Sequence, residues 1–328
     1  MSSMSNPEPA SPAPASGKVP VTVVIPAKNE AANLPRCLDH LRWADDVVVV
    51  DSSSHDVTPA IAAAYGARVI DFQWNGKWPK KRNWALRHAD LKHPWVLFVD
   101  ADEWIVPELA AEVAEAIKSD QNVGYYINRK FIFMGRWLRH CGYYPSWNLR
   151  LIKRGFGEYE RLTSFNETGS GDNEVHEHMV PTGPVGHLKH DMLHFAFPDI
   201  ATFIEKHNRY SSWEAAVEVA GEEGRDKVKG SSDLSRRRKL KLLSRKMPFR
   251  PLLRFIYAYV LRLGFLDGRA GFTFCRLLAI YEFLSVAKTQ EVLRLQDDLA
   301  RGIALSDVPA FDWKNAAAAN DPSAATAK

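Results

Sequence analysis

Four short apolar segments alternate with helix-like stretches between residues 21 and 99, and this alternation limits the possible fold more than any other feature. The segments cover residues 21–25, 47–50, 67–70 and 95–99 and are rich in β-branched residues. Strands that are apolar throughout are typical of parallel sheets buried on both sides. The sequence therefore predicts an α/β fold: a mostly parallel sheet flanked by helices, as in Rossmann-like domains.

Helix-like stretches separate these segments. In residues 31–42, leucines recur at spacings of three and four, and helices are also expected over about 57–65 and 80–88. In open parallel sheets, ligands bind beyond the carboxyl ends of the strands. The segments that directly follow three strands would therefore line one edge and are candidate site segments: residues 26–30, 51–54 and 100–102.

The acidic triplet Asp100-Ala101-Asp102 follows the last of these strands. No GxGxxG follows the first strand and no GxxxxGK[ST] occurs, so a dinucleotide fingerprint and a P-loop are excluded. Two carboxylates at this position suit a hard divalent cation that bridges a diphosphate. The alternative is that Asp100 only caps a turn, with Asp102 or Glu103 near the N-terminus of the helix that contains Pro107.

Longer motifs give this pattern a family context. VTVVIPAKNEAANLPRCLDHL, VVVVDSSSHDVT and WVLFVDADEW, in this order, resemble the nucleotide-sugar-binding half of family 2 glycosyltransferases, which have a GT-A fold. That resemblance covers about residues 20–118. KRNWAL, FMGRWLRHCGYYPSWNLRLIKRG, NEVHEH and LKHDMLH extend it to the bacterial lipopolysaccharide-core β-glucosyltransferase branch.

The resemblance implies roles at the donor site. Asp51 is expected to contact the uracil and ribose, and Asp102 to ligate Mg²⁺ or Mn²⁺ on the diphosphate, with Asp100 nearer the ribose or supporting the metal. Further residues expected to border the nucleotide sugar are Pro26, Ala27, Asn29, Glu30 and Ala101. The basic residues Lys80, Lys81 and Arg82 could approach phosphate oxygens, although such runs are usually solvated faces.

Inverting enzymes of the resembled family use one carboxylate as the base that deprotonates the acceptor hydroxyl. NEVHEH offers Glu177, with Glu174 as the substitute, about seventy residues beyond the acidic triplet. The alternative is that these glutamates form surface ion pairs.

Three histidines crowd residues 187–194, and HDMLH resembles the HExxH of zinc hydrolases with Asp in place of Glu. Because GT-A enzymes often take a further metal ligand from a C-terminal histidine, His194 is the candidate, with His190 next. A buried structural role is the alternative for each. Sugars combine apolar faces with hydroxyls, so an aromatic and basic segment suits them, and its candidates for the sugar or acceptor pocket are Tyr144, Trp147 and Arg150.

The expected organisation begins with a disordered, low-complexity lead-in over residues 1–18 and ends with a disordered tail over 305–328. A GT-A domain over 19–220 divides into a nucleotide-sugar half (19–118) and an acceptor half (119–220). A basic linker (221–250) and amphipathic helices (251–300), broken near 264–271, would follow.

The basic charge is concentrated in one region. The net charge is only +4, but residues 225–254 contain twelve Lys or Arg and two Asp. Arginines then recur about every two helical turns among apolar residues, at positions 254, 262, 269 and 276. This pattern suits helices that lie in an anionic membrane interface, or a core-packing pair with arginines reaching to solvent. With no secretory signal and no uninterrupted spanning segment, we expect a cytoplasmic protein, peripheral on the inner face of the membrane.

The expected function is therefore inverting, metal-dependent transfer of a hexose, with glucose the expected sugar, from a UDP-sugar to a lipopolysaccharide-core or lipid-linked saccharide. One alternative is a sugar nucleotidyltransferase, which would normally carry a Gly-rich loop where PAKNEAAN stands. Another is a non-enzymatic membrane- or nucleic-acid-binding protein using the basic segment. No base-recognition module accompanies that segment, so no nucleic-acid partner is expected.

Overall fold

The computed structural model describes residues 17–160, 178–219 and 249–301. Its main sheet runs β3-β2-β1-β4-β8-β6-β12-β5. The first four strands in this order are parallel, as predicted: β3 (Arg68–Asp71), β2 (Ala44–Asp51), β1 (Val19–Ala27) and β4 (Trp95–Phe98). The expected first strand was too short, because Pro26 and Ala27 pair with β2 as the last residues of β1.

The second half of the sheet mixes directions. β8 (Trp147–Lys153) lies antiparallel to β4 and to β6 (Gly124–Phe133), whereas β12 (Met192–His194) is parallel to β6 and antiparallel to β5 (Glu103–Trp104). Two short strands also pair with β6, namely β7 (Arg136–Trp137) and β11 (Val185–His187). A separate antiparallel pair joins β9 (Gly157–Tyr159) to β10 (Met179–Pro181).

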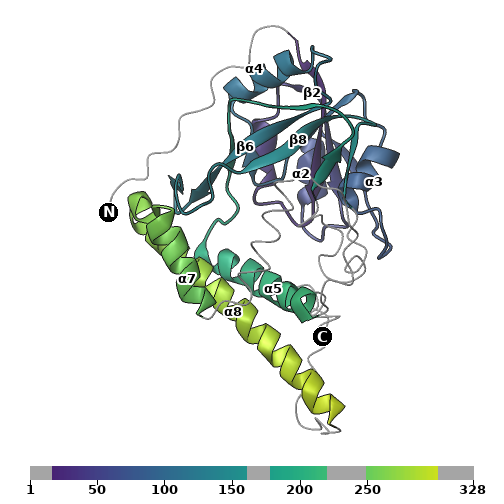
Figure 1. Ribbon diagram of the computed structural model, residues 1–328. Coiled ribbons are helices and arrows are strands. Elements are labelled where there is room, and N and C mark those ends of the chain that lie inside the picture. Colours follow the sequence, from purple (N-terminus) through teal and green to yellow (C-terminus); the bar gives the residue numbers. More distant parts are fainter. Residues whose placement is uncertain (1–16, 161–177, 220–248, 302–328) are drawn as a thin grey trace.

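Helices cover both faces of the sheet (Figure 1), and the strand pleat decides which residues meet them. On one face, Val23 and Ile25 pack in a cluster with α1 (Leu34–Asp39), α2 (Thr58–Ala64) and α4 (Pro107–Ala116). On the other, Val24 packs in a cluster that includes α3 (Lys81–His88). The helices α2 and α3 confirm the predicted ranges, while α1 is shorter than the predicted 31–42.

A helical unit lies beside the sheet (Figure 1). It consists of α5 (Ile200–Val219), α7 (Arg250–Ile256), the π-helical turn η1 (Tyr257–Leu261), the 3₁₀ turn η2 (Gly264–Asp267) and α8 (Gly268–Ala300). The turn η2 lies at the predicted break near 264–271. Gly264–Asp298 is long and apolar enough to cross a membrane by length and composition, with 39% of its most apolar window buried.

One aromatic core joins this unit to the sheet. Phe131 and Phe133 of β6 contact Phe274 of α8, each at 5.2 Å between ring centroids, and Phe203 of α5 belongs to the same cluster. Part of α8 therefore packs on the domain. Its opposite side leaves Phe272, Ile280 and Phe283 exposed, so the helix combines a core face with an apolar outer face.

Candidate active site

The carboxyl ends of β1 and β2 are tied together by hydrogen bonds. Ala27 pairs with Asp51, the last residue of β2. Beyond the strands, the Asn29 amide donates to Ser54 Oγ at 2.8 Å, and Ser54 donates to both Asp51 oxygens, its amide at 2.8 Å and its hydroxyl at 2.5 Å. Since β4 lies on the other side of β1, the segments after all three strands share one edge of the sheet.

Asp100 is held by two arginines. Arg82 Nη2 lies 2.5 Å from one Asp100 oxygen, and Arg150 Nη2 lies 2.6 Å from the other. Burial opposes ionisation of Asp100, but these guanidinium groups outweigh it and keep the pKa of Asp100 well below its ordinary value. Both carboxylate oxygens therefore already accept strong hydrogen bonds, which favours a supporting role over direct metal ligation.

Arg150 is buried against the acidic triplet. Its guanidinium is buried and also donates to Glu103 at 2.7 Å, while the other Glu103 oxygen accepts the Asp100 amide at 2.9 Å. Arg150 thus holds the acidic triplet and Glu103 in place, and its part in a sugar or acceptor pocket stays a prediction. Arg150 stands on β8, whereas Asp100 follows β4 and Glu103 begins β5. The antiparallel pairing of β8 with β4 brings the three residues together.

Asp102 and His194 lie side by side. Their closest atoms, Asp102 Oδ1 and His194 Nε2, are 3.6 Å apart, and the Phe195 amide donates to the Asp102 carbonyl at 2.8 Å. Burial acts to raise the pKa of Asp102, but His194 outweighs it and lowers that pKa. This carboxylate and imidazole were both predicted metal ligands.

The donor set fits a cation that takes most of its ligands from elsewhere. Within residues 17–160, 178–219 and 249–301, no group of three or more His, Cys, Asp or Glu side chains could surround a metal ion. Mg²⁺ and its analogues commonly use one or two protein ligands and complete their shell with water and substrate phosphates. Asp102 and His194 match that pattern.

The other histidines of this segment point to different partners. His190 Nδ1 lies 2.8 Å from Glu112 of α4, and His187 stacks on Tyr126 at 4.9 Å between ring centroids. Because residues 192–194 form a strand, His190 and His194 are not on one helix face, as HExxH zinc binding requires.

The basic run at the start of α3 is buried. Lys80 and Lys81 are 3% and 1% exposed, and Lys81 Nζ donates to the Ala27 carbonyl at 3.0 Å. Together with the Arg82–Asp100 pair, this excludes the solvated-face interpretation. The run instead directs positive charge toward the ends of β1 and β4.

Lys206 of α5 was missed by sequence reasoning. Its ammonium group donates to the Ala196 carbonyl at 3.2 Å, two residues beyond His194, and its charge helps to lower the pKa of Asp102. Glu30 faces the same acids: burial raises its pKa, with Asp102 adding to the effect. Nothing in the local sequence of α5 distinguishes Lys206, because its position depends on how the helix packs.

Trp147 is the first residue of β8, and Tyr144 precedes it by three residues. The Tyr144 hydroxyl donates to Asp191 at 3.1 Å, and Asp191 also accepts from Asn128 at 2.7 Å. Trp147 is 41% exposed and meets His187 edge-on at 4.9 Å. Asp191 was not predicted, although it stands inside the LKHDMLH motif.

Glu174 and Glu177 lie outside the described residues. The residues on either side of the gap are joined, because the His178 amide donates to Glu160 Oε1 at 3.1 Å and the Glu160 amide donates to the His178 carbonyl at 2.9 Å. Next to Glu160, the Tyr159 ring lies 5.3 Å from the Arg82 guanidinium carbon. Both ends of the gap are therefore near the Arg82–Asp100 pair.

A family profile and curated relatives indicate one family. The profile described as glycosyl transferase family 2 matches residues 22–170. The lipopolysaccharide core biosynthesis glycosyltransferase LpsC of Rhizobium meliloti is 31% identical over 83% of this chain and 92% of LpsC. An uncharacterised glycosyltransferase of Rickettsia felis is 28% identical over 86% of this chain and 93% of its own. Among solved structures, S. aureus TarS 1-349 in complex with UDP-GlcNAc has 18% identity and a TM-score of 0.41, covering 86% of this chain and 92% of that one.

Proposed function

This chain belongs to glycosyltransferase family 2, and from that premise we propose that it transfers a hexose, with glucose expected, from a UDP-sugar to a lipopolysaccharide-core or lipid-linked saccharide, with inversion and with Mg²⁺ or Mn²⁺. As a glycosyltransferase it is an enzyme, which sets aside the nucleotidyltransferase and the non-enzymatic alternatives. The observation that carries the proposal is the Asp102–His194 pair, at the same edge of the sheet as Asp51.

Asp102 and His194 would hold the cation against the diphosphate of the donor. When bound, the metal supplies positive charge that stabilises the leaving diphosphate. Lys206 adds a second positive charge from α5. Arg82 and Arg150 offset the negative charges of Asp100 and Glu103. Asp102 is paired with neither arginine, so its carboxylate would attract the cation.

The remaining donor contacts come from the ends of β1 and β2. Asp51 would accept hydrogen bonds from the uracil or ribose, with its carboxylate oriented by Ser54. The backbone of residues 26–29 and Glu30 would border the nucleotide. Asp100, fixed by two arginines, would face the ribose or steady the metal-binding loop.

Glu177 is proposed as the general base, with Glu174 as its substitute. The base takes the proton of the acceptor hydroxyl while the oxygen attacks the anomeric carbon on the face opposite the diphosphate, which inverts the configuration. The proximity of Glu160 and His178 to the Arg82–Asp100 pair supports this choice. Tyr144 and Trp147 offer aromatic surface for the acceptor sugar.

The protein is proposed to work at the inner face of the cytoplasmic membrane. Apolar side chains of the helical unit are exposed on successive elements, among them Leu252 at 57%, Leu261 at 68% and Phe283 at 58%. Such a surface next to arginines suits the interface of an anionic bilayer. The basic run over residues 236–241, which would add to this attraction, lies outside the described residues.

One experiment separates the proposed roles. Thermal unfolding with a panel of UDP- and GDP-sugars, with and without Mn²⁺, identifies the donor, because only a bound ligand raises apparent stability. Asp102→Asn should lose the Mn²⁺-dependent stabilisation by UDP-glucose and lower kcat by about 100-fold or more. Glu177→Gln should keep the stabilisation and lose transfer.

The matched controls are Asp39→Asn, at an exposed carboxylate of α1, and Glu174→Gln. Both should retain donor binding and transfer. If UDP-glucose stabilised Asp102→Asn as much as the unmodified protein, the metal assignment would be wrong. If Glu174→Gln lost transfer and Glu177→Gln kept it, the role of base would pass to Glu174.

A further inference from the structure

One face of α5 is turned toward the acidic triplet. Lys206 donates to the Ala196 carbonyl at 3.2 Å, next to Phe195, whose amide donates to the Asp102 carbonyl at 2.8 Å. Tyr210 stands one helical turn beyond Lys206, so the two side chains share a face of the helix. Burial raises the pKa of Tyr210, and the charge of Asp102 adds to this effect. This face of α5 therefore borders the candidate metal site.

The ammonium group of Lys206 can donate to a ligand. It carries three protons, and among the residues that the structure describes the Ala196 carbonyl is its one hydrogen-bond acceptor. Burial acts to raise the pKa of Asp102 and of Glu30, and the Lys206 charge acts to lower both. An ammonium group with further protons to donate, beside two acids of the proposed donor site, suits the oxygens of a bound diphosphate.

A second lysine holds α5 from the neighbouring helix α8 (Figure 1). Lys288 Nζ donates to the Asn208 carbonyl at 2.7 Å and to Asn208 Oδ1 at 2.6 Å. It also donates to the hydroxyls of Ser211 and Ser212, at 2.9 and 2.8 Å. These four acceptors use all three protons of the ammonium group. Since Asn208 is two residues beyond Lys206, the two lysines act on opposite sides of α5.

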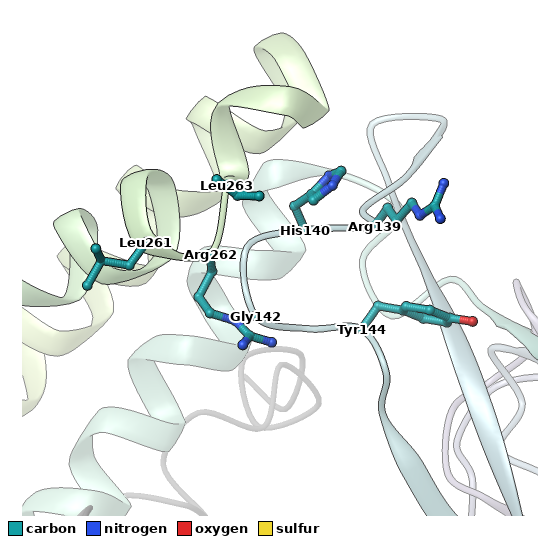
Figure 2. A pocket seen from close by; sticks show the side chains of 7 residues that line it. All are labelled: Arg139, His140, Gly142, Tyr144, Leu261, Arg262 and Leu263. Carbon is teal, nitrogen blue, oxygen red and sulfur yellow. The ribbon is translucent and has the colours of Figure 1, made fainter.

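The helix α8 can hold α5 in place because its own start is fixed on the sheet domain. Figure 2 shows the loop of residues 139–144 beside the turn of residues 261–263, which precedes η2. Asp267, the last residue of η2, accepts from the His140 amide at 2.8 Å and faces His140 Nδ1 at the same distance. The contacts of this loop thus fix the start of the helix that carries Lys288.

We propose that Lys206 binds the diphosphate of the donor, and that Lys288 is the positioning residue that holds α5 where Lys206 can reach it. The inference rests on the proposed function, which supplies the UDP-sugar. It goes further by making the helical unit part of the donor site: the strand ends would bind the nucleoside and the cation, and α5 would bind the phosphates. The Lys206 charge would then stabilise the diphosphate as the bond to the sugar breaks.

The test is calorimetric titration of the full chain with UDP and Mn²⁺, and with uridine, which lacks the diphosphate. Lys206→Met should bind UDP about 10- to 100-fold more weakly, the usual effect of losing a hydrogen bond to a charged group, and should bind uridine as before. Lys206→Arg should keep part of the UDP affinity. Lys288→Met should weaken UDP binding about 3- to 30-fold, as expected for residues coupled in one network, with uridine binding unchanged.

A double variant separates positioning from stability. Because Lys288 acts through Lys206, Lys206→Met/Lys288→Met should bind UDP as Lys206→Met alone does. The control Lys118→Met removes an exposed lysine that pairs with Glu115 of α4, and it should change neither affinity.

Three outcomes would overturn the inference. Unchanged UDP binding by Lys206→Met would remove the contact with the diphosphate. Multiplied losses in the double variant, or equal losses of UDP and uridine binding in Lys288→Met, would leave Lys288 with a structural role alone. If the unmodified protein bound no UDP, the proposed function would fail together with the inference, so the two failures are distinguishable.

Discussion

At the scale of single residues, the acidic triplet shows what its sequence alone predicts. Its place after a buried apolar strand was sufficient to predict an edge position for Asp100 and Asp102. The different roles of Asp100 and Asp102 could not be predicted, because they depend on Arg150 and His194. These two residues reach the triplet through strand pairings across the sheet. Asp100 meets two arginines, while Asp102 meets one imidazole.

Arg150 should be important for stability as well as for the site. Arg150→Met would leave Asp100 and Glu103 with one fewer buried cation, and breaking a buried ion pair in this way typically costs about 3–5 kcal/mol. We expect that loss in the free energy of unfolding by urea. Arg42→Met, at an exposed pair with Asp39, should change it little. An equal effect of the two substitutions would contradict the structural role given to Arg150.

At the scale of secondary-structure elements, local patterns predicted the first half of the fold well. The strands through β4 follow from apolar runs, and α2 and α3 from helical spacing. In the second half, β6 and β8 are long enough to have been predicted, whereas the short strands β5, β7, β11 and β12 were not foreseen, because they contain only two or three residues each. Such strands leave no periodic signal and exist through their pairing with β6 or with each other.

The helix α5 should be sensitive to acid through His207. This histidine is 9% exposed and stacks on Phe203 at 3.7 Å between ring centroids, and burial lowers its pKa. In the unfolded chain its pKa is about 6.5. As the pH falls below that value the unfolded state takes up the proton first, so the stability contributed by neutral His207 is lost down to the lower folded pKa.

Urea unfolding at about pH 7.5 and 5.5, on either side of the ordinary histidine pKa, measures this loss. His207→Gln, which cannot titrate, should show a smaller decrease in the free energy of unfolding over the same interval. The same decrease in both proteins would show that another group is responsible.

At the scale of the whole molecule, the periodic arginines suggested either helices at a membrane surface or a pair of helices packed on the core. In the structure, α8 packs on the domain with one face and exposes apolar side chains on the other. Phe274 is fully buried among aromatic rings from β6 and α5, whereas Phe272 and Ile280 are exposed. Amphipathic spacing could not separate the two interpretations, because both faces of α8 are apolar. Only the packing distinguishes them.

The shared aromatic core should make the sheet and the helical unit unfold together. Phe274→Ala should reduce the free energy of unfolding by about 3–5 kcal/mol, the usual cost of removing a buried aromatic ring. Circular dichroism and tryptophan fluorescence should show the same shifted transition. Loss of helical signal well before the fluorescence change would mean that the two parts are stable separately.

The interface between the sheet domain and the helical unit contains two thiols. They are Cys141 of the sheet domain and Cys275 of α8, which are 1% and 0% exposed. An alkylating reagent cannot reach either sulfur while this interface is closed. The rates at which the two thiols are alkylated would therefore measure how often the interface between the sheet domain and the helical unit opens. Comparing these rates with and without a bilayer would show whether membrane contact slows the opening.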